Sequence, residues 1–434
     1  MSDTHANTVA FVRDTMLPER APPSTAIGPV AWGRENLFSS PANTVITLVS
    51  VAFIYLILSI LIPWASHNTW AATSLADCRE MTGKDHGAAC WGVIRDRWRQ
   101  ILFGNYPVDM RWRPILALIL LFVALAPILF SNLPRKLLIV SAAYPFIMPW
   151  LVWGGTIWLP VMVALGFVIA YAIIRFGEPV LGSLGSMLAA VAAALIWWLF
   201  LASPVAEGLA SVLPLAIEKL NSSRDIGGLM LAFVIGVVAI GCSLPIGIVL
   251  ALGRQSDLLI VKALCVGFIE FIRGVPLITL LFVASTLLNI FLPPGTNFDI
   301  ILRVIIMVTL FSAAYMAEVI RGGLAALPKG QYEGGDSLGL NYWQAQRLII
   351  MPQALKIAIP GIVSTFIGLF KDTTLVSIIG LMDPIGWATA IRADTDWIGI
   401  LWELYAFIAV LFFIICFGMS RYSMYLERKL KTSH

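Results

Sequence analysis

Two adjacent charged residues, Lys371 and Asp372, lie well inside an apolar run that extends from about 357 to 380. If that run crosses a membrane, each charge costs about 2.5–3.5 kcal/mol, so such residues are usually paired or functional. The two charges either neutralise each other and fix helix packing, or one or both line a path on which a charged solute crosses the membrane. Both interpretations stay open, and Lys371 and Asp372 are candidate path residues.

A second charge pattern occurs twice in the chain. Glu270 is followed by Arg273, and Glu318 by Arg321, with a glycine after each arginine. The i,i+3 spacing places both charges of a pair on one helix face. The simpler interpretation is two local ion pairs where helices meet the cytoplasm. Glu318 remains a further candidate for the membrane path.

Arg273 also precedes a predicted helix break. Gly274 comes next, and Pro276 lacks an N–H and has a ring that clashes with the preceding turn. Broken helices expose backbone groups, and transporters place them beside substrate paths. We therefore predict that Arg273, Gly274 and Pro276 form a hinge or gate between a membrane-surface helix, 257–273, and a span, 277–292.

Signals for catalysis are missing from the sequence. It contains no G-x-x-x-x-G-K-[ST] loop, which would cradle the phosphates of ATP. No cluster of His, Cys and Asp has metal-ligand spacing, and no nucleophile stands beside a base in a soluble pocket. We predict a protein that is not an enzyme and needs no metal or other cofactor. Any ATP-driven step requires hydrolysis by another chain.

Two of the five cysteines, Cys78 and Cys90, lie in a polar loop at about 65–113. In an oxidising compartment such a pair is a candidate disulfide. The alternatives are a metal site with the nearby His67 and His86, or two free thiols. The other three cysteines lie in or beside apolar runs, where cysteine is usually a small inert hydrophobe.

The elements that must hold these residues are membrane helices. Of the 434 residues, 59% are apolar and 12% are charged, about half of the 25% that is typical of a soluble domain. The stretch 137–174 has no Asp, Glu, Lys or Arg, and since one bilayer crossing needs about 20 apolar residues, it holds two spans. The fold class is therefore all-α and polytopic. The net charge of +4 comes with no basic soluble domain, which excludes nucleic-acid binding.

About ten spans are predicted, and the loop charges predict their orientation. Lysine and arginine gather in 254–273, in 321–356 and after 421, whereas the loops 293–299 and 381–396 are acidic or nearly neutral. Because basic loops stay in the cytoplasm, both chain ends are predicted to be cytoplasmic. The spans are 45–64, 114–132, 137–154, 157–174, 184–203, 226–252, 277–292, 300–320, 357–380 and 400–420.

Four regions follow from this pattern. A flexible cytoplasmic tail, 1–43, is rich in proline and shows no helical period. An accessory membrane region, 44–225, includes the 65–113 loop, which the span count places in the periplasm. The core is 226–421, and a basic cytoplasmic tail, 422–434, ends the chain.

The 65–113 loop conflicts with the orientation rule, because five of its six arginines lie close together at 95–113 and arginine-rich loops belong on the cytoplasmic side. Either the segment 92–104 lies on the outer membrane surface as an amphipathic helix, or the placement of the loop is wrong. The arginines are Arg95, Arg97, Arg99, Arg111 and Arg113.

The connection at 330–353 carries the most informative motif of the chain. Its sequence, GQYEGGDSLGLNYWQAQRLIIMPQ, has amphipathic helical spacing, and Pro352 is predicted to close it. Glu333, Gly339, Ile349 and Pro352 match the spacing E-A-A-x3-G-x9-I-x-L-P. The segment therefore resembles the loop that marks the membrane subunits of ABC importers.

That resemblance implies a short helix and a tight turn that project into a cleft on a cytoplasmic ATPase. At Gly339 the backbone can turn or approach a partner where a side chain would not fit. Two motif alanines are glycines here, at a cost of about 1–2 kcal/mol of helix stability, and the motif leucine is Met351. The residues implied to contact the ATPase are Glu333, Gly334, Gly335, Asp336, Leu338, Gly339, Ile349 and Pro352.

Four core segments resemble the polar amino-acid branch of the ABC importer permeases, in the order of that family. The most similar members are the permeases of general L-amino-acid importers. The resemblance implies a five-helix type I permease core in a bacterial inner membrane. The segments are FIEFIRGVPLITLLF (268–282), SAAYMAEVIRGGLAALPKGQYEGG (312–335), IMPQALKIAIPGIV (350–363) and GLFKDTTLVSIIG (368–380).

The same resemblance implies a function and partners. The chain would move L-amino acids from periplasm to cytoplasm, as a heterodimer with a second permease, above a dimer of ATP-binding subunits and below a periplasmic amino-acid-binding protein. Membrane lipid is the remaining partner. Two other hypotheses stay open: a secondary transporter driven by an ion gradient, and a structural subunit whose partner permease carries the pore.

Overall fold

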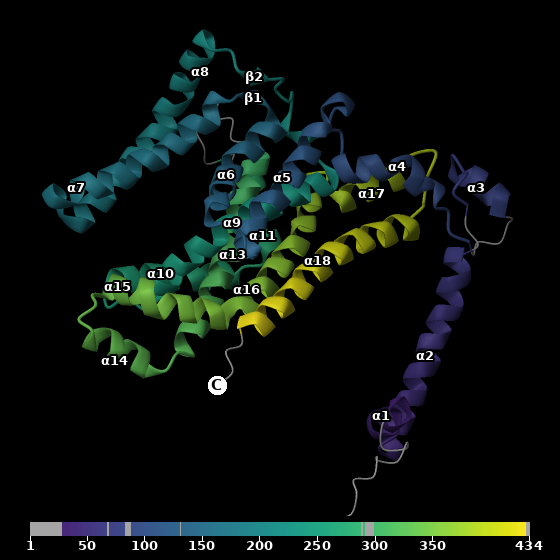
Figure 1. Cartoon of the computed structure of the whole chain (residues 1–434). Coiled ribbons are helices and arrows are strands. Elements are labelled where there is room, and N and C mark those ends of the chain that lie inside the picture. Colours follow the sequence, from purple (N-terminus) through teal and green to yellow (C-terminus); the bar gives the residue numbers. More distant parts are fainter. Residues whose placement is uncertain are drawn as a thin grey trace, which may run out of the picture. The chain divides into compact units, whose positions relative to one another are not determined.

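The computed structural model describes residues 28–66, 69–82, 88–130, 132–287, 290 and 299–430, without the side chains of residues 183 and 184. Nearly all of the described elements are helices (Figure 1). Two short strands, β1 (Gly155–Thr156) and β2 (Ala216–Ile217), pair antiparallel. The predicted all-α class is confirmed.

The chain forms two compact units. One comprises the residues up to Thr69 together with Arg79–Ala89, and the other comprises Trp70–Cys78 together with the chain from Cys90 onward. The second unit contains all residues of the candidate site.

The first unit corrects the expectation of an irregular tail that reaches residue 43. Helix α1 (Pro29–Asn36) begins with a proline, whose fixed φ suits the first helical position. Helix α2 (Pro41–Ser66) is 26 residues long, and none of its side chains is buried in the described structure. That exposure fits a span that faces lipid. The predicted tail residues 1–27 lie outside the described residues.

The accessory helices of the second unit pack against one another. Tyr144 on α6 donates its hydroxyl hydrogen to the Ala117 carbonyl on α5 over 3.1 Å. Helix α7 departs from helical geometry at Gly182, where φ is 70°, so two successive spans follow there. The elements before the core are α3 (Leu75–Thr82), α4 (Gly92–Phe103), η1 (Val108–Met110), α5 (Trp112–Leu129), η2 (Arg135–Leu137), α6 (Leu138–Trp153), α7 (Trp158–Ile196), η3 (Trp197–Leu201), α8 (Ala202–Val212) and η4 (Ser223–Asp225).

Small residues let the core helices approach closely, as membrane helices commonly do. A Cβ atom added at Gly323 on α13 would meet the Ala354 carbonyl oxygen of α16 at 2.5 Å, and one at Gly247 on α9 would meet Met316 at 2.8 Å. The core elements are α9 (Gly228–Arg254), α10 (Leu259–Gly274), α11 (Leu277–Phe282), η5 (Val283–Leu287), α13 (Ile300–Ala325), α14 (Lys329–Ser337), α15 (Tyr342–Ala345), η6 (Gln346–Ile350), α16 (Met351–Asp372), η7 (Thr373–Ile379), α17 (Pro384–Arg392) and α18 (Trp402–Leu430).

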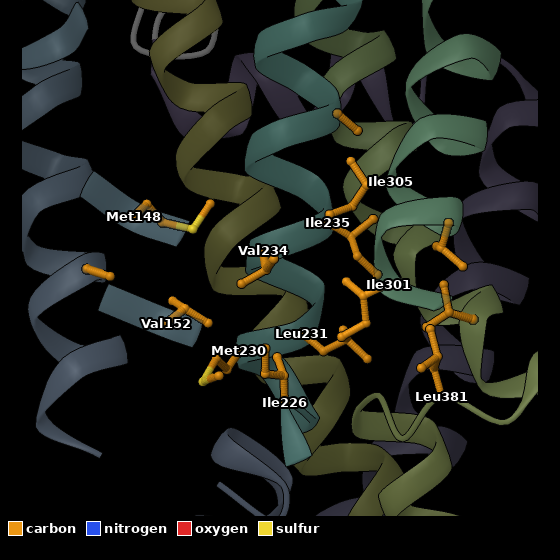
Figure 2. Close-up of a cluster of buried hydrophobic side chains, with 14 of the residues drawn as sticks. Met148, Val152, Ile226, Met230, Leu231, Val234, Ile235, Ile301, Ile305 and Leu381 are labelled. Atoms are coloured by element: carbon orange, nitrogen blue, oxygen red, sulfur yellow. The ribbon is translucent and has the colours of Figure 1, made fainter. Parts of the chain in front are cut away.

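One hydrophobic cluster joins the accessory helices to the core. Figure 2 shows Met148 and Val152 of α6 pointing toward Met230 and Val234 of α9, with Ile301 of α13 on the opposite side of α9. The predicted boundary between accessory region and core therefore crosses a continuous apolar contact.

Nine helices of the described part are long and apolar enough to span a membrane, and there are ten if the bent pair α10–α11 counts as one span. This agrees with the predicted count of about ten. The bend is 101° and lies at Val275 and Pro276, where the helix break is predicted. Of the predicted span 277–292, the structure describes residues 277–287 and Ile290.

The prediction that Pro352 closes the 330–353 segment is wrong. Helical structure is continuous over 38 residues, from Tyr342 to Ile379, so this span starts well before residue 357. Pro352 lies in the first turn of α16, directly after the π-helical turn η6. A proline removes one backbone donor and crowds the preceding turn, and a wider π turn accommodates both effects.

Candidate functional site

A cluster of five charged residues joins the ends of three core helices. Glu318 on α13 lies at its centre, with a side chain that is 16% exposed. One carboxylate oxygen of Glu318 accepts a hydrogen bond from Arg254 at the end of α9, and the other accepts one from Arg321 over 3.0 Å. Arg254 also donates to Glu270 on α10 over 2.9 Å. Arg273 Nη1 lies 3.8 Å from Glu318. We call these residues the Glu318 cluster.

The cluster contains one of the two predicted local ion pairs. Glu318 pairs with Arg321 as the i,i+3 spacing indicates. The prediction for Glu270 and Arg273 is wrong, because no ion pair between them occurs in the part of the chain that the structure describes. Arg273 instead reaches Glu318, with its guanidinium 5.5 Å from the Tyr315 ring centre. Each side chain has a partner on another helix in place of the local one: Glu270 binds Arg254 of α9, and Arg273 lies near Glu318 of α13.

Arg254 is the member of the Glu318 cluster that sequence reasoning missed. It is the last residue of α9, and it connects Glu270 and Glu318, which are 48 positions apart in the chain. Its position as the first charge after the apolar run 226–253 is the signal that could have found it.

The predicted hinge lies directly beside the Glu318 cluster. Helix α10 ends at Gly274, and α11 begins after Pro276, which stands outside it as the N-terminal cap residue. Arg273 thus connects the last turn of α10 to α13, two residues before the chain bends. Of the three predicted residues, Arg273 lies near Glu318, and Gly274 and Pro276 follow it in the chain.

The 330–353 segment forms a helix, a glycine turn and a second helix. Helix α14 forms in spite of its adjacent glycines, and Gly339 has φ of +71°, a conformation that L side chains rarely adopt. Asn341 then caps α15 through a reciprocal pair of hydrogen bonds with Gln344. Of the residues implied to contact an ATPase, Gly335 is buried, Ile349 is half-buried, and Glu333, Gly334, Asp336, Leu338, Gly339 and Pro352 are exposed.

Large apolar side chains make this turn unusual for a solvent-facing loop. Leu338 is 73% exposed and Trp343 is 68% exposed. Exposed aromatic and aliphatic residues next to a rigid turn are typical of a surface that a protein partner covers.

Lys371 and Asp372 lie far from the Glu318 cluster. Ala354 packs against Gly323 near the cluster, and Lys371 follows Ala354 by 17 residues, which is about 26 Å along a helix. Lys371 is exposed and Asp372 is half-buried, and no direct ion pair joins them in the described structure. The structure therefore separates the candidate path residues into two groups.

A layer of short elements covers the end of the core opposite the Glu318 cluster. We define this α4 layer as residues 70–78 and 90–104. A disulfide joins Cys78 and Cys90, with Cα atoms 6.1 Å apart, and the Cys90 N–H donates to Glu403 Oε1 of α18 over 2.9 Å. The alternative metal ligands His67 and His86 lie outside the described residues.

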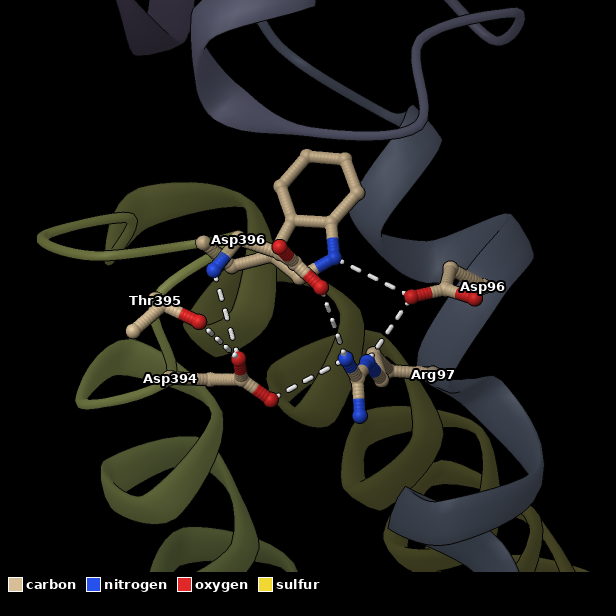
Figure 3. A network of polar contacts seen from close by, with 6 residues as sticks. Asp96, Arg97, Asp394, Thr395 and Asp396 are labelled. Carbon is tan, nitrogen blue, oxygen red and sulfur yellow. Dashed lines mark hydrogen bonds and ion pairs between the residues drawn. The ribbon is translucent and has the colours of Figure 1, made fainter.

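An ion network fastens this layer to the loop that follows α17. Figure 3 shows Arg97 between Asp96 and the aspartates of that loop. The arginine lies 2.8 Å from Asp96, 3.0 Å from Asp394 and 3.9 Å from Asp396. The Trp397 indole N–H also donates to Asp96 over 3.1 Å.

Four of the five arginines that conflict with the orientation rule have acceptors within the protein, and the fifth, Arg99, lies 5.4 Å from the centre of the Trp98 ring. Arg95 donates to the Ala71 carbonyl over 3.0 Å, Arg111 to Tyr106 over 3.2 Å, and Arg113 to Glu218 over 2.6 Å. The predicted helix at 92–104 is observed as α4 (Gly92–Phe103). Hydrogen bonds to protein oxygens hold this basic segment in place. Its position therefore does not depend on the charge-based orientation rule alone.

Asp383 is a buried carboxyl at the same end of the core. Its Oδ1 caps α17 by accepting the Gly386 N–H over 2.8 Å, and its Oδ2 is buried with no hydrogen-bond partner in the described structure. Burial raises the pKa of Asp383 to about 6, although backbone N–H groups at Gly386 and Ile385 act in the opposite direction.

Asp383→Asn is expected to remove a pH dependence of stability. Because the folded pKa is raised from 3.8 to about 6, the folded protein binds more protons between these values, and its free energy of unfolding falls as pH rises through them. The loss reaches about 3 kcal/mol above pH 6. Asparagine keeps the capping oxygen and carries no charge. The variant should unfold at the same temperature as wild type at pH 4 and at a higher temperature than wild type at pH 7.5. Equal unfolding midpoints of variant and wild type at both pH values would contradict this prediction.

Comparisons with known proteins decide the family. Residues 243–432 match the family described as binding-protein-dependent transport system inner membrane component. The glutamate/glutamine/aspartate/asparagine transport system permease protein BztC of Rhodobacter capsulatus is 56% identical to this chain, over 100% of each protein. The chain belongs to this family of ABC transporter permeases. It is also 39% identical to the inner membrane amino-acid ABC transporter permease protein YhdY of Escherichia coli, over 93% of each protein.

A solved structure is similar over part of the permease. It is the crystal structure of an amino acid ABC transporter with histidines, at 30% identity and a TM-score of 0.41, over 46% of this chain and 90% of that one. Family membership makes this protein an inner-membrane permease subunit and not an enzyme by itself. Its partners are an ATP-binding subunit, which hydrolyses ATP, and a substrate-binding protein. Among the described residues, no cluster of three or more metal-ligating side chains is found.

Proposed function

We propose that this permease moves L-amino acids from periplasm to cytoplasm, and that acidic amino acids and their amides are the substrates. The observation that carries the proposal is the full-length identity of 56% with a permease named for glutamate, glutamine, aspartate and asparagine transport. We further propose that both chain ends are cytoplasmic, which puts the α4 layer and its disulfide in the oxidising periplasm.

The ATPase acts through the α14–α15 turn in this proposal. Exposed Leu338 and Trp343 flank the glycine turn and supply the apolar contact. The helix that begins at Tyr342 is continuous to Ile379, so a push on the turn tilts a membrane helix without an intervening loop. Closure of the ATPase dimer then rocks the helices between inward-open and outward-open states.

We propose that the gate and the substrate path lie in two separate parts of the core. Arg273, Gly274 and Pro276 form the hinge, since the Glu318 cluster holds one side of a 101° bend. Lys371 is exposed on a span, and a charge that faced lipid there would cost about 2.5–3.5 kcal/mol. We therefore propose that Lys371 and Asp372 face an aqueous path shared with a second permease in a heterodimer.

Gly339→Val tests the coupling role of the turn. Valine is strongly disfavoured at a φ of +71°, so the turn must change shape, although no atom lies within 4 Å of the new Cβ position. In liposomes that contain the assembled complex and the binding protein, we expect ATP-driven glutamate uptake to fall at least tenfold while the complex still assembles.

Gly330→Val is the matched control, because Gly330 also has open space and lies in helix α14 with ordinary backbone angles. Its uptake should stay within about twofold of wild type. Normal uptake by the Gly339 variant would contradict the coupling role. Uptake by wild type without ATP, driven by an ion gradient, would instead favour the secondary-transporter hypothesis.

A further inference from the structure

An apolar cavity of about 120 Å³ lies between the accessory helices α5 and α6 and the core helix α9. Met148 and Val152 line it from α6, and Met230 and Val234 line it from α9. Figure 2 shows the first pair of side chains pointing toward the second. The function proposed above assigns no role to this space. The helices α5, α6 and α9 are candidate membrane spans, and Leu102 and Phe103 at the end of α4 complete the lining.

The cavity offers nothing that water or a polar solute could bind. Tyr144 is the one lining residue with a hydroxyl group, and that hydroxyl already donates to the Ala117 carbonyl over 3.1 Å. A buried water needs two to four polar partners, whereas a dry apolar cavity of about 150 Å³ binds a molecule such as benzene. The occupant must therefore be apolar.

The shape of the cavity fits a chain better than a compact molecule. Its wall on α9 runs from Leu229 to Val237, which is about 12 Å along a helix. Ile115 lines it and is 45% exposed, and Val237 is half-buried, so the cavity reaches the surface of the spans. A helix, about 10–12 Å wide, is too large to enter.

Positive charge marks one end of the cavity. The guanidinium of Arg111 lies 5.8 Å from the ring centre of Phe103, a lining residue, and its Nε is held by the Tyr106 carbonyl. Arg113 is buried, and in the sequence it directly precedes Pro114, which lines the cavity. No carboxylate forms an ion pair with either arginine in the described ranges. Trp112 between them is 52% exposed, as is typical of aromatic residues at the membrane–water boundary.

We propose that this cavity is a phospholipid site, in which one acyl chain fills the space between α5, α6 and α9 and the phosphate binds Arg111. The apolar wall recognises the chain, and the arginine supplies the charge-assisted hydrogen bonds that a phosphate prefers. The lipid joins the accessory helices to the transport core. This site is independent of which amino acid is carried.

The test uses the assembled complex, purified in detergent, stripped of lipid and titrated with palmitoyl-oleoyl-phosphatidylglycerol under native mass spectrometry. We expect saturable binding of one tightly held phospholipid per copy of this chain. Val237→Phe fills the cavity from α9 and should remove that binding. Arg111→Gln should weaken it at least tenfold, because the phosphate loses its partner while the apolar wall is unchanged.

Val249→Phe is the matched control. Val249 lies on the same helix, is 66% exposed and does not line the cavity, so its variant should bind lipid like wild type. Leu118→Phe fills the cavity from α5 and replaces Val237→Phe if that variant does not assemble. The proposal is overturned if wild type shows no saturable lipid, if only detergent is retained, or if both cavity-filling variants bind as wild type does.

Discussion

Glu318→Ala is expected to lower glutamate uptake at least tenfold and to destabilise the assembled complex by about 2–4 kcal/mol. Glu318 is 16% exposed and accepts hydrogen bonds from Arg254 and Arg321, with Arg273 3.8 Å away. Its removal leaves three guanidinium groups facing one another with only Glu270 to balance them. Breaking a buried ion pair from one side typically costs about 3–5 kcal/mol, and partial exposure reduces that value.

Thermal unfolding of the purified complex and uptake in liposomes measure the two effects. Glu270→Ala is the control, because Glu270 binds the same arginine but is 53% exposed, and exposed pairs contribute about 0–1 kcal/mol. If the two variants were equally stable and equally active, the Glu318 cluster would be neither a structural joint nor part of the gate.

Gly228→Ala is expected to destabilise the complex by about 2–5 kcal/mol and to loosen the α4 layer. Gly228 has φ of +61°, and a Cβ there would lie 2.3 Å from the Ile101 carbonyl oxygen of α4. The left-handed conformation costs an L residue about 1–2 kcal/mol, and forced overpacking adds about 1–3 kcal/mol. The clashing atom is backbone and cannot rotate away.

Gly241→Ala on the same helix is the control, since nothing lies within 4 Å of its Cβ position. Alanine in a regular helix is more stable than glycine by about 0.5–1 kcal/mol, so this variant should unfold at or above the wild-type temperature. Similar unfolding temperatures for the two variants would show that the α4 layer does not depend on close contact with α9.

The positions of the spans could be predicted from the sequence because their signal is local. An apolar run of about 20 residues has to be a helix in a membrane, whatever surrounds it. The break at Pro276 is equally local, since the missing N–H and the ring belong to the residue itself. Pro352 shows the limit of that reasoning, because a π-helical turn beside it keeps the helix continuous.

The partners of charged residues could not be predicted, because they come from distant parts of the chain. The i,i+3 spacing identified Arg321 as a partner of Glu318, but it could not show that Arg254 would reach Glu270 from the end of α9. The pairing of Arg97 with Asp394 is more remote still. Charge spacing thus identifies a local candidate pair but not the partners that other helix ends supply, as Arg254 shows for Glu318 and Glu270.

The arginine-rich 65–113 loop shows how a fold can modify a compositional rule. Counting charges places such a loop in the cytoplasm, but Arg97 is matched by aspartates and Arg113 is held by a carbonyl group. Arginines bound in this way act mainly as hydrogen-bond donors that stabilise the fold, and less as free surface charges. Their number alone is then a weak guide to the side of the membrane.

The hydrogen bond between Cys90 and Glu403 has a consequence for how the permease is made. The two residues are 313 positions apart, so at about 5–20 residues per second the first waits about 15–60 s for the second to be synthesised. Until residues 388–408 arrive, Val93, Ile94 and Ile101 of α4 lack the later members of their apolar cluster, which include Trp397, Leu404 and Ile408. A chain that stops before residue 403 is therefore expected to leave the apolar face of α4 partly uncovered.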